Sequence, residues 1–168
     1  TTETWRYDQY FLDYTYEFFF KTETEKNGTF FALCKEQTEE NCGSSSDHDW
    51  EIFIMDDGKV GFRHEVTSSS NPLLLSDDAY NDGVWHHLAI VTNWDNNKAY
   101  LYMDGMEVDS SSVSWDWEWK YDMYMKVGGS EWPFSDSESY AAYEGLIDSI
   151  RISGGGSHDG GSDDIGIF

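Results

Sequence analysis

The residues with the clearest chemical meaning are tryptophans that alternate with charged side chains. Trp115, Trp117 and Trp119 are separated by single charged residues, so an extended chain places all three indoles on one face. Such a face can stack against a sugar ring while the charged neighbours supply hydrogen bonds. Trp94 and Trp132 lie in expected loops and could join the same site. The pattern favours carbohydrate binding, although the same indoles could cap a core or contact another protein.

Two adjacent histidines, His86 and His87, are the other residues that suggest a metal or base site. Neighbouring side chains on a strand point to opposite faces, so these imidazoles cannot share one site. We expect one of them to be buried and the other exposed. The sequence shows no recognisable Ser-His-Asp set and no phosphate-binding loop. No catalytic residue is assigned on these grounds.

Two covalent modifications are predicted. Cys34 and Cys42 are separated by seven polar or acidic residues, and a disulfide across so short a loop would contribute about 2–3 kcal/mol. We expect this disulfide, with a pair of free thiols in a reducing compartment as the alternative. Asn27 begins an Asn-Gly-Thr acceptor sequence for glycosylation at an expected exposed hairpin tip. Turn formation alone would also explain the choice of these residues.

The chain is strongly acidic, with a formal net charge of -23 over 168 residues. A folded protein of this mass exposes about 8,500 Å², so net charges stand about 19 Å apart, beyond the Debye length of about 8 Å. The charge is therefore tolerable in salt, but it argues against nucleic acid and anionic membranes as partners. A solvated surface for a saline habitat, cation binding and a cationic partner all remain open. No apolar run approaches the about 20 residues needed to span a bilayer.

Apolar residues recur with a period of two, and helical spacing is almost absent. Turn residues separate these segments, with expected hairpins at Asn27-Gly28 and at residues 56–58, 94–97 and 104–105. The expected strands cover residues 14–22, 29–34, 50–55, 59–66, 84–92, 99–103, 106–109, 122–127 and 145–153, with the apolar run 73–75 as a tenth candidate. This succession favours an all-β, two-sheet antiparallel jelly-roll sandwich. We expect one domain, residues 1–153, followed by a Gly- and Asp-rich tail, residues 154–168.

Three segments, taken in order, resemble the laminin G-like domains of the concanavalin A-like lectin/glucanase superfamily. They are residues 81–91 (NDGVWHHLAIV), 99–105 (AYLYMDG) and 145–152 (GLIDSIRI). The segment KVGGS, residues 126–130, matches the strand that usually precedes the last of them. The ordered set supports the jelly-roll fold over most of the chain. Within it, Trp85 is expected to begin a strand and to bury a large apolar area.

The resemblance also implies a structural calcium ion, held by the aspartate of the last strand. Asp148 matches that position, and Asp8 or Asp13 could contribute from the N-terminal segment. Asp148 also alternates with Leu146 and Ile150 on the expected interior side of the strand, where an unpaired carboxylate would be costly. Pairing of Asp148 with Arg6 or Arg151 is the alternative. The acidic stretches 76–78 and 159–164 could also bind Ca²⁺.

Glycanases of the superfamily carry their catalytic acids in an E-x-D-x-x-E pattern on one strand. The nearest segment here has Glu51, but Phe53 stands where the central aspartate is needed, and Asp56 replaces the second glutamate. Glycoside hydrolysis requires an opposed pair of carboxylates, and this strand does not supply one. The resemblance therefore implies a protein that is not an enzyme.

The functional prediction is an extracellular, non-catalytic binding or adhesion module that recognises carbohydrate or protein and is stabilised by calcium. The alternative is a structural subunit of an extracellular filament or surface assembly. The apolar end of the tail, residues 165–168, motivates this alternative because it could dock on the sheet edge of a neighbouring copy.

Overall fold

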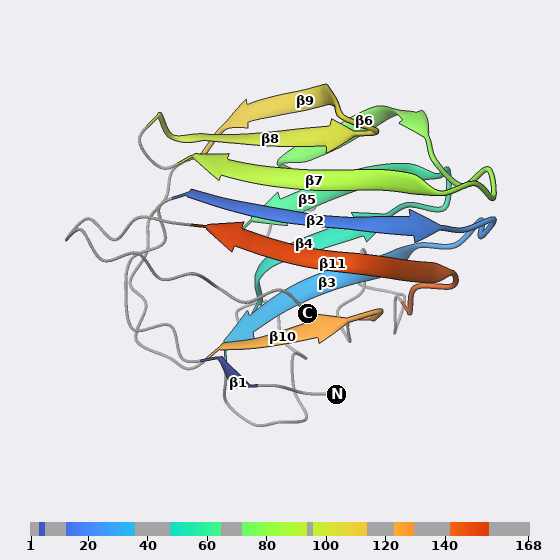
Figure 1. Cartoon of the computed structure of the whole chain (residues 1–168), viewed down its shortest axis with the longest axis horizontal. Coiled ribbons are helices and arrows are strands. Elements are labelled where there is room, and N and C mark those ends of the chain that lie inside the picture. The colour runs from blue at the N-terminus through green and yellow to red at the C-terminus, as the bar shows by residue number, and fades with distance from the viewer. Residues whose placement is uncertain are drawn as a thin grey trace.

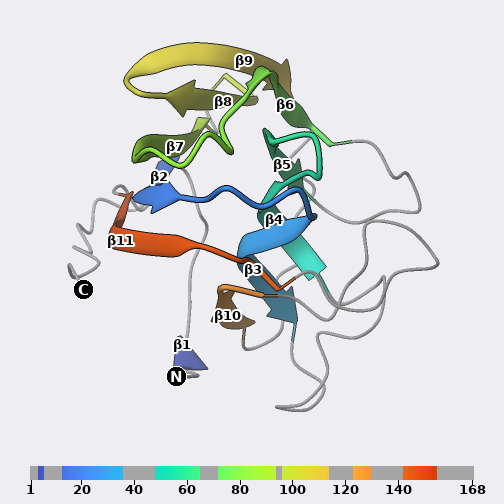
Figure 2. The ribbon, with the colours of Figure 1, turned by 90° about the vertical axis from the view of Figure 1, so that its right-hand side faces the viewer.

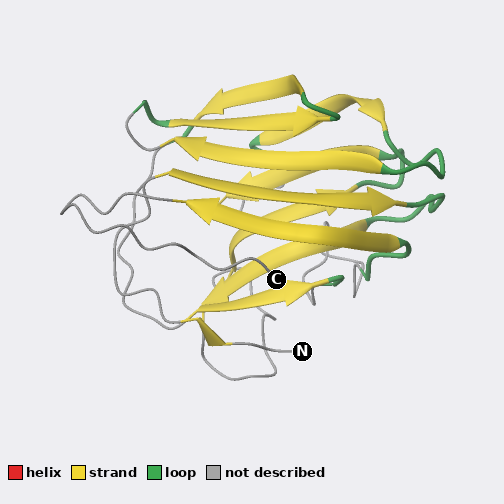
Figure 3. Cartoon of the chain, viewed as in Figure 1, coloured by secondary structure: helices red, strands yellow, loops and turns green. Residues whose placement is uncertain are grey.

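The alternating apolar segments form antiparallel β-strands, as the sequence predicts. The computed structural model describes residues 4–5, 13–35, 48–64, 72–93, 96–113, 123–129 and 142–154. These residues contain eleven strands and no helix (Figure 1 and Figure 3). Every pairing between the strands is antiparallel. The predicted all-β class is confirmed.

The strands are divided between two sheets that face each other as a sandwich (Figure 2). Sheet A has the order β1 (Thr4–Trp5), β10 (Met123–Val127), β3 (Gly28–Lys35), β4 (His48–Ile54), β5 (Lys59–His64), β6 (Leu74–Ala79). Sheet B has the order β11 (Leu146–Gly154), β2 (Asp13–Lys21), β7 (His86–Asn93), β8 (Lys98–Met103), β9 (Met106–Ser112). Strand β1 was not predicted, and β6 extends into a stretch that was expected to be loop.

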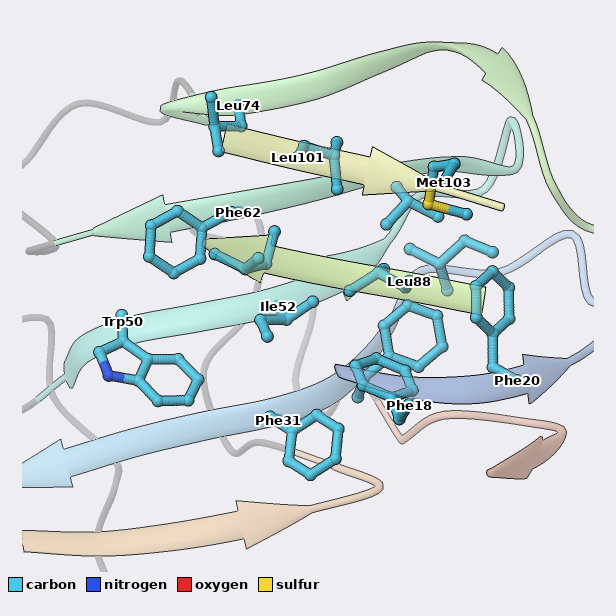
Figure 4. Packing of buried hydrophobic residues seen from close by; sticks show 14 of the residues in the cluster. Phe18, Phe20, Phe31, Trp50, Ile52, Phe62, Leu74, Leu88, Leu101 and Met103 are labelled. Atoms are coloured by element: carbon cyan, nitrogen blue, oxygen red, sulfur yellow. The ribbon is translucent and has the colours of Figure 1, made fainter. Parts of the chain in front are cut away.

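The core lies between the sheets and is built from alternate residues of their strands. Phe18 and Phe20 of β2 meet Phe30 of β3 across the sandwich, with ring centroids 5.1 Å and 4.8 Å apart. Phe62 from sheet A and Leu88 from sheet B belong to the same cluster (Figure 4). These side chains are almost fully buried, so truncating one of the phenylalanines to alanine is expected to cost about 3–5 kcal/mol.

Two Asp-Gly sequences form the hairpin turns that were predicted from them. Gly58, between β4 and β5, has a φ of 83°, and the pair Asp104 and Gly105, between β8 and β9, has φ values of 51° and 79°. At Asp104 and Gly105, positive φ at both central residues matches the twist of a two-residue hairpin. The turn at Gly58 is longer, and the N–H of Met55 donates to the carbonyl of Lys59 across it. The hairpin between β7 and β8 is also confirmed.

The predicted hairpin at Asn27-Gly28 is wrong. Strands β2 and β3, on either side of it, belong to different sheets, so the segment 22–27 crosses from one sheet to the other. Asn27 fixes this crossing because its side-chain oxygen accepts a hydrogen bond from the backbone N–H of Asp56, 2.9 Å away. An Asx side chain can satisfy a backbone donor without forming a hairpin.

The expected interior position of Asp148 is also wrong. A β-bulge interrupts the pairing of β11 with β2 between Asp148 and Arg151, and Ser149 within it has a φ of 54°. The extra residue reverses the alternation, so Ile147 and Ile150 pack against the core while Leu146 and Asp148 are exposed. The carboxylate of Asp148 therefore carries no burial cost.

Candidate functional site

The outer face of sheet B is turned toward the viewer in Figure 1. The strand register puts aromatic and polar residues on this face. Alternation puts Phe18 and Leu88 in the core and their neighbours on the opposite side. Glu17 of β2 pairs with Arg151 of β11 on one side and with Ala89 of β7 on the other. Ala89 pairs in turn with Tyr102 of β8. In the next row, Phe19 lies between Asp148 and His87. We call the set Glu17, Phe19, His87, Tyr100, Tyr102 and Arg151 the sheet B face.

Glu17 is at the centre of a network of polar contacts on this face. Its Oε1 lies 3.3 Å from Nη1 of Arg151, and its Oε2 lies 3.2 Å from Nε2 of His87. The imidazole of His87 in turn packs on the ring of Phe19, with centroids 4.9 Å apart. Glu17 is thus held from two sides, and Phe19 presents an aromatic surface that is 42% exposed.

Two tyrosines continue the face across β8. The rings of Tyr100 and Tyr102 have centroids 6.4 Å apart. The side-chain amide of Asn96 donates to the hydroxyl of Tyr100 at 3.2 Å, and the hydroxyl of Tyr102 donates to Glu107 at 3.5 Å. Burial, the charge of Glu107 and the hydrogen bond to it raise the pKa of Tyr102. Both rings are half-buried, so each combines a fixed apolar surface with a polar tip.

A second polar group crosses the outer side of sheet A, but it is buried. Lys126, Ala32, Glu51 and Arg63 are in register on four adjacent strands. Glu51 is 1% exposed and Arg63 is 5% exposed, and Glu51 accepts a hydrogen bond from Thr29 at 2.5 Å. Burial raises the pKa of Glu51 from 4.5 to about 7, against the opposing effects of Thr29 and Arg63.

Glu51 is the first residue of the acid pattern that was compared with glycanases. Among the residues that the structure describes, Thr29 and Arg63 are the polar groups that act on it. Asp56, the other acid of that pattern, lies in the exposed turn after β4. The described part of the chain therefore brings no second carboxylate against Glu51, as a glycoside hydrolysis site would require.

A third cluster joins the loop before β7 to the turn after β8. Nδ1 of His86 lies 2.8 Å from Asp104 and its Nε2 lies 3.1 Å from Asp82. Burial lowers the pKa of His86, but the hydrogen bonds to both carboxylates outweigh it and raise that pKa above its usual value. His87 contacts Glu17 on the outer side instead, so the expectation that the two histidines point to opposite faces is confirmed. The expectation that one is buried and the other exposed is wrong, because both are partly buried and both have acidic partners.

The expected burial of Trp85 is wrong. The residue precedes the first residue of β7 and its side chain is 46% exposed. His86 occupies the position at the edge of the core, where it packs against Phe20 and Tyr80. The chain reaches the core one residue later than the prediction assumed.

The predicted metal ligands do not come together in the described residues. Asp13 pairs with Asn93 at one end of β2, while Asp148 pairs with Phe19, six residues away. At about 3.3 Å per strand residue the separation is about 20 Å, so the two aspartates cannot share one ion. Asp148 accepts a hydrogen bond from the N–H of Ser149 at 2.7 Å, and no group of three or more potential ligands stands together in the described ranges. Ca²⁺ takes six to eight oxygens, and backbone carbonyls can be among them. Asp13 is therefore wrong as a partner of Asp148, while a calcium ion at Asp148 stays a prediction.

Several predicted residues lie outside the described ranges. They are Asp8, Cys42, Trp94, Trp115, Trp117, Trp119, Trp132, the acidic stretch 159–164 and the tail end 165–168. Cys34 lies on β3, opposite Tyr124, and its disulfide stays a prediction. Glycosylation of Asn27 also stays a prediction, although the threonine of its acceptor sequence, Thr29, is fully buried.

Sequence reasoning missed the sheet B face. The expected strands 14–22 and 84–92 contain the signal, because their outward positions carry Glu17, Phe19 and His87. Only the register of two long-range strand pairings, however, puts Arg151 on one side of Glu17 and Ala89 on the other. Among the described residues, no helix is long and apolar enough to cross a membrane.

Comparison with solved structures supports the same architecture. The mouse laminin alpha1 chain, domains LG4-5, superposes with a TM-score of 0.62 at 14% identity over 91% of this chain and 38% of that one. The Ruminococcus gnavus IT-sialidase CBM40, solved with alpha2,3 sialyllactose, has a TM-score of 0.62 at 16% identity over 84% and 76%. A heptameric SAP-like pentraxin from Limulus polyphemus has a TM-score of 0.54 at 15% identity, over 84% of this chain and 64% of the pentraxin. At these identities the likeness shows the fold alone.

No curated protein sequence matches the chain. A family profile does match, over residues 6–155, and its description is that of the concanavalin A-like lectin/glucanases superfamily. This match spans most of the 168 residues and includes all three segments that carried the resemblance. The chain belongs to the concanavalin A-like lectin/glucanases superfamily and has a laminin G-like, lectin-like fold.

Proposed function

We propose that the chain is an extracellular, non-catalytic module that binds a neutral glycan on the sheet B face. The observation that carries this proposal is the network of Glu17 with Arg151 and His87, next to the exposed ring of Phe19. An aromatic surface beside hydrogen-bonding groups held in place suits a sugar, which has apolar C–H faces and a rim of hydroxyls. The side chains of Glu17 and Phe19 are already held by their neighbours before a ligand arrives, so binding costs less conformational entropy.

The tyrosines extend the same surface in a way that fits an oligosaccharide. Tyr100 and Tyr102 lie on the strand next to β7, and each has its hydroxyl engaged by a polar neighbour. Aromatic rings with a polar tip are suited to contacts that are partly apolar and partly solvated. We expect one sugar unit over Phe19 and a second toward the tyrosines.

The charge of the chain favours a neutral ligand. The CBM40 module with a similar fold was solved with sialyllactose, which supports carbohydrate as the ligand class. With a net charge of -23, however, the present chain repels an anionic sugar, and the positive charge of Arg151 is already balanced by Glu17.

A glycan array with neutral and sialylated members, followed by calorimetry, tests the proposal. Phe19→Ala is expected to weaken binding about tenfold, which corresponds to about 1.4 kcal/mol for one aromatic contact. Val127→Ala is the matched control, because Val127 is also an exposed apolar residue but lies on sheet A. Equal affinity of the Phe19 variant and the wild type would contradict the assignment of this face. Binding to sialylated glycans alone would contradict a neutral ligand.

A further inference from the structure

One end of the sandwich has a character different from that of the sheet B face. It is the end where β2 stops and where β7 and β11 begin, at the right in Figure 1. Hydrogen bonds join its loops: Gly83 donates to the carbonyl of Thr22 at 2.9 Å, and the side chain of Asn81 donates to the carbonyl of Thr24 at 2.9 Å. The backbone N–H of Tyr80 donates to Gly58 at 2.8 Å. The loops therefore form one connected surface.

This surface carries an excess of carboxylates. Its acidic side chains are Glu23, Glu25, Asp56, Asp57, Asp82, Asp104 and Glu144. Its lysines are Lys21, the last residue of β2, Lys26, whose Nζ lies 2.6 Å from Glu144, and Lys59, whose Nζ lies 3.9 Å from Asp57. The remaining carboxylates exceed the basic groups even when His86 is protonated. We call this surface the acidic end.

Exposed apolar residues lie at the acidic end, among them Val84, Trp85 and Leu146, the first residue of β11. Val84 is 50% exposed and Trp85 is 46% exposed. Their loop is fixed, because the N–H of Val84 donates to the side chain of Asp82 at 3.0 Å and His86 links Asp82 to Asp104. A tryptophan held at the surface by its own loop loses little freedom when a partner covers it, and tryptophan is among the residues that dominate binding energy at protein interfaces.

We propose that Val84 and Trp85, with the surrounding carboxylates, form a docking site for an arginine-bearing, partly apolar segment of another protein. A guanidinium group can stack on the indole face while its N–H groups reach the carboxylates. The negative net charge of the chain favours this partner over others. Nucleic acid and acidic glycans are repelled, and so is a second copy of the chain, which carries the same net charge of -23.

The probe is a short peptide in which several arginines alternate with leucine and glycine, labelled for fluorescence anisotropy. Its control is the same peptide with the uncharged analogue citrulline in place of arginine. The arginine peptide is expected to bind, and its affinity is expected to fall when salt rises from about 0.05 M to about 0.5 M, as screening shortens the reach of the carboxylates. The citrulline peptide is expected to bind at least about tenfold more weakly.

Substitutions at Trp85 locate the site. Trp85→Ala is expected to weaken the arginine peptide about five- to tenfold, and Trp85→Phe to have an intermediate effect because phenylalanine is the poorer cation–π partner. Val127→Ala and Phe19→Ala are expected to bind the peptide as the wild type does. Trp85 is half exposed, so its variants should keep the melting temperature of the wild type, which separates loss of binding from loss of folding.

Three results would overturn the docking site. They are wild-type affinity in Trp85→Ala, equal affinity for the arginine and citrulline peptides, and no binding of the arginine peptide at low salt. None of them bears on the glycan proposal, whose test is the Phe19 variant. A loss of peptide binding in Phe19→Ala instead of Trp85→Ala would place the peptide on the sheet B face and would also refute this assignment.

Discussion

The buried carboxyl group of Glu51 makes a definite prediction about stability and pH. Burial raises its pKa to about 7 in the folded protein, from an ordinary value of 4.5. Thr29 and Arg63 lower the pKa but do not cancel the effect of burial. In the unfolded chain the group is solvated and keeps the ordinary value. Between pH 4.5 and about 7, the folded protein therefore binds a proton that the unfolded chain has released.

The sign and size of the effect follow from this difference. Because the folded state binds more protons in this window, the free energy of unfolding falls as pH rises. The contribution of Glu51 is fully present below pH 4.5 and is lost as pH rises through about 7. A shift of about 2.5 units corresponds to about 3 kcal/mol. Glu51 is 1% exposed, so solvent screening does not reduce this figure appreciably.

Glu51→Gln isolates this contribution, because an amide is close in shape to the protonated carboxyl group and does not titrate. Urea unfolding of wild type and variant at pH 5 and pH 8 gives the free energy of unfolding of each. The two proteins are expected to be close in stability at pH 5. At pH 8 the variant should be the more stable, by up to about 3 kcal/mol. Groups that titrate in both proteins cancel in the difference.

Two results would refute the reasoning. A wild type–variant difference that does not change with pH would mean that Glu51 titrates normally in the fold. A difference that changes in favour of the wild type as pH rises would mean that attraction between the ionised Glu51 and Arg63 exceeds the cost of burial. In that case the loss of stability in Glu51→Gln at high pH would reflect the charge of Arg63, which the variant leaves buried without its partner.

Two further predictions concern His86 and Asp148. The pKa of His86 is raised in the fold, so the stability that its charged form contributes is present below its unfolded pKa and is lost as pH rises through its folded pKa. His86→Gln should remove this part of the pH dependence of the melting temperature. A pH profile of the variant that matches the wild type would contradict the prediction. For Asp148, the described residues bring no group of three or more His, Cys, Asp or Glu side chains together, so we expect Asp148→Asn to leave any calcium-induced rise in melting temperature unchanged. Loss of the calcium response in that variant would restore Asp148 as a ligand.

Most of the fold could be predicted because its strands alternate strongly and its hairpins have specific turn residues. The Asp-Gly pair at Asp104 and Gly105 requires positive φ values and takes them. Asn27 and Gly28 carry an equally good local signal, yet the chain changes sheets there. Local turn chemistry shows that the chain bends, but only long-range pairing determines which sheet the next strand joins.

The site was less predictable because it depends on small irregularities and on distant pairings. The bulge at Ser149 reverses the faces of β11 and moves Asp148 from the expected interior to the surface. A shift of one residue at the start of β7 exposes Trp85 and puts His86 at the core edge. The period-two pattern of the sequence does not reveal such single-residue changes. The bulge in β11 and the shift at the start of β7 nevertheless decide which side chains a ligand can reach.

The two proposed surfaces differ in their charge, and ionic strength therefore separates them. On the sheet B face, the charge of Arg151 is balanced by Glu17 at 3.3 Å, so a neutral ligand there experiences a small net field. At the acidic end, the carboxylates outnumber the basic side chains of the described residues, which are Lys21, Lys26, Lys59 and His86. Raising the salt concentration to about 1 M shortens the Debye length to about 3 Å. It should weaken binding at Trp85 strongly and leave binding at Phe19 nearly unchanged, which a single shared site could not do.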